Sequence, residues 1–244
     1  MATASPSSNA NLTSQWPFTN GSLSGTKGEV LNNVLNKAQG QTGLTGRFGV
    51  ANSALSSNYG FDSYLTNYWP LCNSQGKDLI SAANLITGPN ITFVADRFNN
   101  SNAAMSLNLD GARVPSGYYF NSPQITITVW VFLISIFSPY WPQILDFSNG
   151  KAVDNIMLLF DTGNNKIPRF YLEANSLDSS TALTINKWHF LAITYDGSTQ
   201  NIYTDGILTG SLSQTYSFNS PFLRNQNFFG KTNFSGHDTG CLAY

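Results

Sequence analysis

Residues 187–208 read Lys-Trp-His-Phe-Leu-Ala-Ile-Thr-Tyr-Asp-Gly-Ser-Thr-Gln-Asn-Ile-Tyr-Thr-Asp-Gly-Ile-Leu, and this stretch decides the fold class. Large apolar residues alternate with polar ones before the first Asp-Gly step, and a second alternating run ends in another Asp-Gly step. Alternation with a period of two is typical of β-strands, and Asp-Gly supplies the positive φ angles of tight hairpin turns. The stretch therefore predicts a β-meander, and we expect Trp188, Ala192 and Trp130 to point into one core between two sheets.

Short apolar runs separated by turn residues, about one every ten positions, continue on both sides of this meander. The predicted strands are Ala104–Leu107, Gly117–Phe120, Ile125–Ile136, Gln143–Phe147, Asn155–Phe160, Pro168–Leu172, Trp188–Tyr195, Asn201–Thr204, Ile207–Ser211 and Asn227–Gly230. No helix is needed in this part of the chain. The expected class is an all-β sandwich, for which 244 residues are enough to build one core.

The composition limits the range of partners. Only 10% of the residues are charged and the net charge is −1, so the basic surface that binds nucleic-acid backbones is missing. The long apolar run 125–137 is shorter than the roughly 20 residues of a membrane-spanning helix, and Pro139 follows it. We therefore expect neither a nucleic-acid partner nor a transmembrane segment. The N-terminus has no basic start and no apolar core, so no signal peptide is visible.

The first part of the chain differs from the rest. Residues 1–66 are rich in Ser, Asn, Gly and Thr, and we expect a poorly ordered low-complexity segment or a degenerate repeat. The repeat interpretation depends on a partial match between residues 47–58 and 97–108. We accordingly divide the chain into residues 1–66 and a sandwich domain at residues 67–244.

Several motifs resemble those of a known family. They are Tyr68–Leu71, Ala104–Gly111, Ile125–Val131, Ile144–Gly150 and Asp154–Leu158, followed by the meander at 187–208. In this order and spacing they resemble the laminin-G-like and pentraxin-like jelly rolls of the concanavalin A-like lectin/glucanase superfamily. The resemblance implies an antiparallel jelly-roll β-sandwich that serves as a non-catalytic binding module. It also implies glycan or protein ligands and a place outside the cell or on its surface.

Two features depart from that family pattern. The family's closing strand has no counterpart after residues 228–236, so we expect a sandwich that lacks its closing C-terminal strand. An open sheet edge would then favour self-association. The cysteine pair that joins two core strands in pentraxins is replaced here by Thr128 and Ala192. A structural or adhesion repeat of a larger extracellular protein is an alternative function, which would gain support if the N-terminal third of the chain formed a second, broken sandwich.

Catalytic residues are sparse. Hydrolytic relatives of this sandwich use paired carboxylates, but the two glutamates, Glu29 and Glu173, have no acidic partner at strand spacing. Only His189 and His237 could act as the base of a nucleophilic triad, and we expect His189 to be a partly exposed strand residue. We therefore expect no enzyme. Pairs of aspartates leave a glycoside hydrolase as a further alternative.

Two groups of residues are candidate binding sites. Asp154 and Asn155 stand where pentraxins carry an Asp-Asn pair that ligates calcium, so the resemblance implies a weak calcium site to which Asp238 would contribute. The same pair also fits a turn before a strand. Tyr140 and Trp141 follow a long strand in a predicted loop, where they could stack on a sugar or pack over a sheet edge.

Overall fold

The computed structural model describes residues 65–107, 111–122, 124–136, 141–150, 155–160, 165–216, 222–234 and 241–243, together with short strands before residue 65. Contacts divide the chain into two compact units, Met1–Tyr68 and Trp69–Tyr244. In the first unit, β1 (Phe18–Thr19) pairs with β2 (Ser22–Leu23), and β3 (Gly43–Leu44) pairs with β4 (Ala54–Leu55). The remaining strands belong to the second unit.

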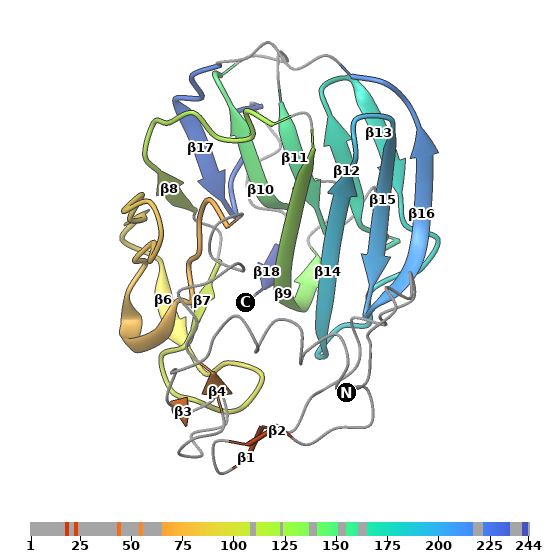
Figure 1. The fold of residues 1–244 in the computed structure, drawn as a ribbon. Coiled ribbons are helices and arrows are strands. Elements are labelled where there is room, and N and C mark those ends of the chain that lie inside the picture. Colours follow the sequence, from red (N-terminus) through yellow and green to blue (C-terminus); the bar gives the residue numbers. More distant parts are fainter. Residues whose placement is uncertain are drawn as a thin grey trace. The chain divides into compact units, whose positions relative to one another are not determined.

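The second unit contains two antiparallel sheets that lie face to face (Figure 1). In spatial order, the seven-stranded sheet consists of β13 (Asn175–Asp178), β12 (Arg169–Leu172), β11 (Ile156–Leu159), β10 (Gln143–Ser148), β17 (Gln226–Phe229), β8 (Ala112–Val114) and β5 (Ile86–Thr87). The five-stranded sheet consists of β16 (Ile207–Ser213), β15 (Thr199–Thr204), β14 (Trp188–Tyr195), β9 (Ile125–Ile136) and β18 (Cys241–Ala243). A separate hairpin joins β6 (Thr92–Val94) to β7 (Ala104–Ser106). The described residues therefore confirm the antiparallel β-sandwich.

The core fills the space between the two sheets. Apolar side chains from alternate positions of both sheets are buried there, including Leu133, Phe147, Leu158, Phe170, Leu191, Ile193 and Ile202. The ring of Phe147 meets the rings of Tyr119 and Phe120 edge to face, with centroid distances of 5.1 and 5.2 Å. Burial of these side chains makes the main contribution to stability, because the stabilising free energy is roughly proportional to the apolar area that folding removes from water.

The hairpin turns form as the Asp-Gly steps predict. Asp205 and Gly206 have φ angles of 53° and 85°, the left-handed conformation that a two-residue hairpin requires. At the other turn, the Asp196 carboxylate accepts hydrogen bonds from the backbone N–H groups of Ser198 and Thr199, each at 2.8 Å. These two turns fix the register of β14, β15 and β16.

Two predictions about the strands were wrong. Trp188, Ala192 and Trp130 share one face of their sheet, but it is the outer face, because His189, Leu191 and Ile193 occupy the inner positions of β14. A register shift of one residue moves every side chain of a strand to the opposite face of the sheet. Because β14 carries large apolar residues on both faces, its sequence pattern does not show which face is buried. In addition, residues 117–120 form no strand; Gly117 makes a single bridge to Arg224.

The edge of the five-stranded sheet is covered over part of its length. The terminal strand β18 pairs with β9 only from Leu133 to Ile136. Before Leu133, β9 has no strand partner on that side among the described residues. No helix in the described part of the chain is long and apolar enough to cross a membrane.

Candidate functional site

Four aromatic side chains gather on the outer face of the five-stranded sheet. Strand register places Phe190 opposite Trp130 and Trp188 opposite Phe132, so the four residues form two cross-strand pairs on β9 and β14. Their ring centroids are 5.3 Å apart in the first pair and 5.4 Å apart in the second. We call these four residues the aromatic face.

The aromatic face is accessible from solvent. Trp130 is 38% exposed, and Phe132, Trp188 and Phe190 are half-buried. Large aromatic rings on an outer sheet face are not needed for the core, which the opposite face of β9 and β14 already fills. Exposed apolar clusters of this kind mark binding surfaces in soluble proteins.

A strip of small polar side chains continues the aromatic face along the same strands. Thr126 and Thr128 precede Trp130 at alternate positions of β9, and Thr194 lies opposite Thr126 on β14. On β15, the Asn201 amide donates a hydrogen bond to the Thr194 hydroxyl at 3.3 Å. Rings beside hydroxyl and amide groups offer both a stacking platform and hydrogen-bonding partners.

The loop between β6 and β7 reaches this surface. The guanidinium carbon of Arg97 lies 4.3 Å from the ring centroid of Trp130 and 4.3 Å from that of Phe98. Asp96 shapes the loop by accepting hydrogen bonds from the backbone N–H groups of Phe98 and Asn100, both at 2.9 Å. Burial by itself raises the pKa of Asp96, but the hydrogen bonds from Asn100 and Phe98 outweigh it and lower the pKa overall.

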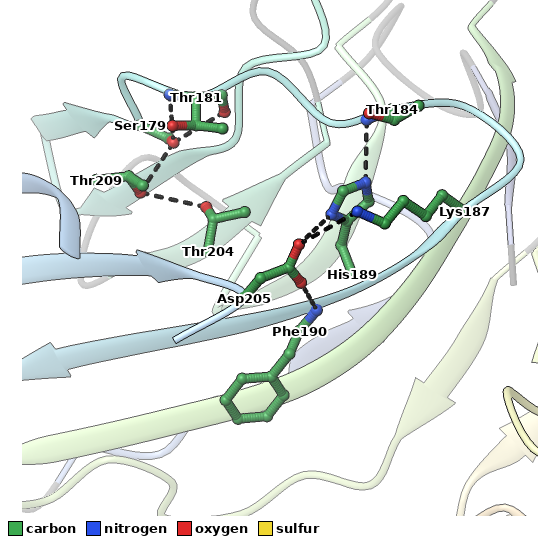
Figure 2. Close-up of polar contacts among 9 residues, drawn as sticks. All are labelled: Ser179, Thr181, Thr184, Lys187, His189, Phe190, Thr204, Asp205 and Thr209. Carbon is green, nitrogen blue, oxygen red and sulfur yellow. Dashed lines mark hydrogen bonds and ion pairs between the residues drawn. The ribbon is translucent and has the colours of Figure 1, made fainter. Parts of the chain in front are cut away.

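Asp205 fixes the backbone beneath the aromatic face. Its carboxylate accepts a hydrogen bond from the Phe190 N–H at 2.9 Å and lies 2.8 Å from Nδ1 of His189. The Lys187 ammonium is 4.0 Å from the same carboxylate. Figure 2 shows Asp205 between these three residues, with His189 reaching on to Thr184. The turn residue therefore holds β14 and the chain segment that precedes it.

His189 takes part in this network through both of its ring nitrogens. The prediction that it is partly exposed was wrong, because the residue is 4% exposed and belongs to the inner face of β14. Its Nε2 atom accepts a hydrogen bond from the Thr184 N–H at 3.0 Å, which assigns the proton to Nδ1 and directs it to Asp205. A triad needs Nε2 to accept the proton of a nucleophile. In this arrangement a backbone N–H already occupies that position.

A second network in the same region joins the sheets. The Ser179 hydroxyl lies 3.0 Å from that of Thr209, which lies 3.2 Å from that of Thr204, and Ser179 also accepts the Thr181 N–H at 3.0 Å (Figure 2). These bonds tie the segment after β13 to β15 and β16. They satisfy buried hydroxyls that would otherwise destabilise the fold.

A buried carboxylate lies on the other sheet. Asp146 of β10 is 0% exposed, and its Oδ2 atom accepts hydrogen bonds from the Thr232 hydroxyl at 2.7 Å and the Asn233 N–H at 3.0 Å. Its Oδ1 atom has no hydrogen-bond partner among the described residues, and the same holds for Oδ1 of Asn149 and of Asn155. Burial raises the pKa of Asp146, although hydrogen bonds from Asn233, Thr232 and Ser148 act in the opposite direction.

Asp146→Asn should therefore change how stability depends on pH. A carboxyl whose pKa is raised by folding costs stability as pH rises through that raised value, because ionisation is harder in the folded state. With calcium absent, we expect the wild type and the Asn variant to be similar at acidic pH. The Asn variant should become the more stable of the two as pH rises. Urea unfolding at a series of pH values measures the difference, and a constant difference across the series would contradict the assignment.

The predicted site residues are placed as follows. Trp141 lies beside Arg169, with 5.4 Å from the guanidinium carbon to the ring centroid, on the outer face of the seven-stranded sheet. Asn155 directly precedes β11 and is 2% exposed. Tyr140, Asp154 and Asp238 lie outside the described residues. Trp141 and the aromatic face thus belong to different sheets.

The surroundings of Trp141 are polar and charged. Arg169 makes two hydrogen bonds to the Asp178 carboxylate, at 2.5 and 2.7 Å, and a third to the Tyr171 hydroxyl at 3.1 Å. The hydrogen bonding that Arg169 donates to the Asp178 carboxylate is the main reason that the pKa of Arg169 is raised. Because the guanidinium already binds a carboxylate, Trp141 covers a neutralised ion pair.

Sequence reasoning missed the aromatic face and the buried Asp146. The sequence did carry a signal for the aromatic face. Trp130 lies at an alternate position to Thr126 and Thr128 and therefore on the same face of the strand, and threonines are typical of the solvent side. Asp146 gave no local signal, because its hydrogen-bond partners Thr232 and Asn233 are 86 and 87 residues away.

Comparisons with known proteins concern the fold first. The model of the family Laminin_G_3, described as the concanavalin A-like lectin/glucanases superfamily, matches residues 99–243, which is more than half of the chain. No curated protein sequence matches this chain. The family match agrees with the resemblance found in the sequence motifs.

Solved structures share the architecture at low sequence identity. Domain 4 of AbnA, a GH43 extracellular arabinanase from Geobacillus stearothermophilus in complex with arabinotriose, has a TM-score of 0.56 and 18% identity over 73% of this chain and 88% of that chain. A Trypanosoma rangeli sialidase has a TM-score of 0.53 and 14% identity over 88% of this chain, which corresponds to 35% of the sialidase. At these identities the comparison shows the fold alone.

Proposed function

Because this chain belongs to the concanavalin A-like lectin/glucanases superfamily, we propose that it is a non-catalytic module that binds saccharides through its aromatic face. The observation that carries the proposal is the exposed ring of Trp130, paired with the half-buried ring of Phe190, beside a strip of hydroxyl and amide groups. Aromatic rings stack on the apolar faces of sugar rings, and neighbouring polar groups then orient the hydroxyls.

A binding role is supported further by the state of the catalytic candidates. His189 uses both ring nitrogens within the fold, and the other histidine candidate, His237, lies outside the described residues. In the arabinanase structure, the similar domain comes from an extracellular protein. We propose the same extracellular or cell-surface setting for this chain. A protein ligand, or a structural role in a larger assembly, is the alternative.

Replacing Trp130 with alanine is expected to weaken saccharide binding about 10-fold or more, because it removes the most exposed ring of the stacking platform. A glycan array first identifies a ligand, and calorimetric titration then measures its affinity. Trp141→Ala is the matched control, since it removes the same side chain from the other sheet. Loss of binding in Trp141→Ala with unchanged binding in Trp130→Ala would move the site to Tyr140 and Trp141.

We also propose a weak calcium site near Asn155. Asp146, Asn149 and Asn155 supply buried side-chain oxygens without hydrogen-bond partners among the described residues, and oxygen atoms of this kind are the ligands that calcium prefers. Asp154 and Asp238, which lie outside the described residues, are the further carboxylates of this proposal. Few carboxylates give affinities of roughly 0.1–1 mM, which suits an extracellular module.

Calcium should raise the melting temperature of the wild type, and a chelator should reverse the effect. Asp146→Asn and Asp154→Ala should each abolish the shift, while Asp196→Asn, at an exposed hairpin turn, should retain it. The same melting temperature with calcium and with chelator in the wild type would contradict the calcium site. It would leave the aromatic face unaffected.

The part of the β9 edge that has no strand partner within the described ranges supports self-association as a further proposal. Backbone groups of an unpaired edge can pair with a strand of another copy. Sedimentation should show concentration-dependent dimers if this occurs. A monomer at all concentrations would contradict it.

A further inference from the structure

His189 accepts a hydrogen bond that a protonated imidazole cannot accept. Its Nε2 atom accepts the Thr184 N–H at 3.0 Å, while Nδ1 lies 2.8 Å from the Asp205 carboxylate (Figure 2). Protonation would place an N–H group on Nε2, directly opposite the Thr184 N–H. Two donors cannot bond to each other, so a charged ring would keep its bond to Asp205 and lose the one to Thr184.

Asp205 and Lys187 are the charged groups that the structure brings to the His189 ring. The Asp205 carboxylate attracts a proton on the ring, and the Lys187 ammonium, 4.0 Å from that carboxylate, acts in the opposite direction. The elements packed around the ring add no charge from residues 179–186, which are all uncharged, or from β9, which places Val131 opposite His189.

The charged residues of the neighbouring segments are engaged elsewhere. Arg169 and Asp178 pair with each other on the outer face of the seven-stranded sheet. Lys166 meets the segment around Thr184 through its backbone carbonyl, which accepts the Leu183 N–H at 2.7 Å. The balance of charge at His189 therefore depends on Asp205 and Lys187.

The segment that contains Thr184 is suited to local opening. It joins β13 to β14, and between Ser180 and Lys187 only Leu183 is buried. Beyond Thr184, the Asn186 N–H donates to the Leu133 carbonyl at 2.7 Å. Exposed segments with few buried contacts open without unfolding of the whole domain. Each hydrogen bond that holds this segment therefore matters to it.

We propose that His189 is an acid-sensitive latch, which holds the chain around Thr184 at neutral pH and releases it when a solvent proton binds Nε2. Histidine is suited to this role because it changes its charge between about pH 5 and 8. The released chain leads directly into Trp188 of the aromatic face. The latch itself does not depend on any ligand of that face.

NMR of the wild type tests the latch without a substitution. The nitrogen shifts of the His189 ring report its charge, and hydrogen exchange of the Thr184 amide, corrected for the intrinsic rate at each pH, reports its protection. Between about pH 7.5 and 5 the ring should become charged, and protection of Thr184 should fall about 10-fold or more. The Ser179 amide, which donates to the Pro168 carbonyl at 2.9 Å, is the internal control and should keep its protection.

Asp205→Asn removes the carboxylate that attracts the proton and keeps an acceptor oxygen, so release of Thr184 should require a lower pH. Asp196→Asn, the same change at the other Asp-Gly turn, should leave the pH of release unchanged. A His189 ring that stays neutral down to pH 5, or Thr184 protection that is equal at both pH values, would overturn the latch. Equal losses of protection at Thr184 and Ser179 would also overturn it, because general unfolding would then explain both.

Discussion

Replacing Phe147 with alanine is expected to lower the free energy of unfolding by about 3–5 kcal/mol, because it opens a cavity in the centre of the core. Phe147 is 2% exposed and contacts the rings of Tyr119, Phe120 and Phe229. These neighbours come from two segments of the chain, residues 119–120 and β17, and cannot all move inward to fill the space. Urea unfolding measured at equilibrium gives the difference directly.

The informative control is Trp188→Ala. Removing this larger side chain would lower the free energy of unfolding as much as Phe147→Ala, or more, if Trp188 occupied the core. Trp188 instead lies on the outer face, with Phe132 as its ring partner. We therefore expect a loss well below that of Phe147→Ala. Equal losses in the two variants would contradict the assigned faces of β14.

Asp205→Ala should lower the free energy of unfolding by about 2–3 kcal/mol, since it leaves the buried Nδ1–H of His189 without an acceptor. It also removes the acceptor of the Phe190 N–H and places an alanine at a φ of 53°. Because the segment around Thr184 is held through His189, we expect hydrogen exchange to accelerate there.

The variant Asp205→Asn distinguishes the effect of the turn conformation from that of the hydrogen-bond network around the carboxylate. Asparagine tolerates the left-handed conformation and keeps one acceptor oxygen, so this variant should lose less stability than Asp205→Ala. Unchanged stability of Asp205→Ala would show that the network contributes nothing. Acceleration of hydrogen exchange spread over the whole chain, with none centred on Thr184, would contradict the local role.

The fold was predictable because its signals are local and repeated. Period-two alternation and the two Asp-Gly turns located β14, β15 and β16, and the structure gives β9 and β14 the predicted bounds. Short strands such as β8 and β13 escaped prediction, because three or four residues between turns carry too little pattern.

The candidate site was harder to predict because it depends on which face of a strand is buried. Both faces of β14 carry large apolar residues, Trp188 and Phe190 on one side and Leu191 and Ile193 on the other. Only packing against the second sheet decides between them, and that sheet is formed by distant parts of the chain. The aromatic pair at Tyr140 and Trp141 drew attention because it stands in a predicted loop. Aromatic residues at alternate positions in the middle of a strand give the same sequence pattern whether they face the core or the solvent.

Fluorine NMR of protein labelled with 5-fluorotryptophan shows directly which tryptophan side chains contact a bound saccharide. Trp130 and Trp188 belong to the aromatic face, Trp69 donates its indole N–H to the Ala83 carbonyl at the edge of the core, and Trp141 lies on the other sheet. Single Trp→Phe variants assign each resonance. On titration with a saccharide ligand, we expect the resonance of Trp130 to shift most, with a smaller shift for Trp188 and none for Trp69 or Trp141. A shift of Trp141 with Trp130 unmoved would contradict this expectation.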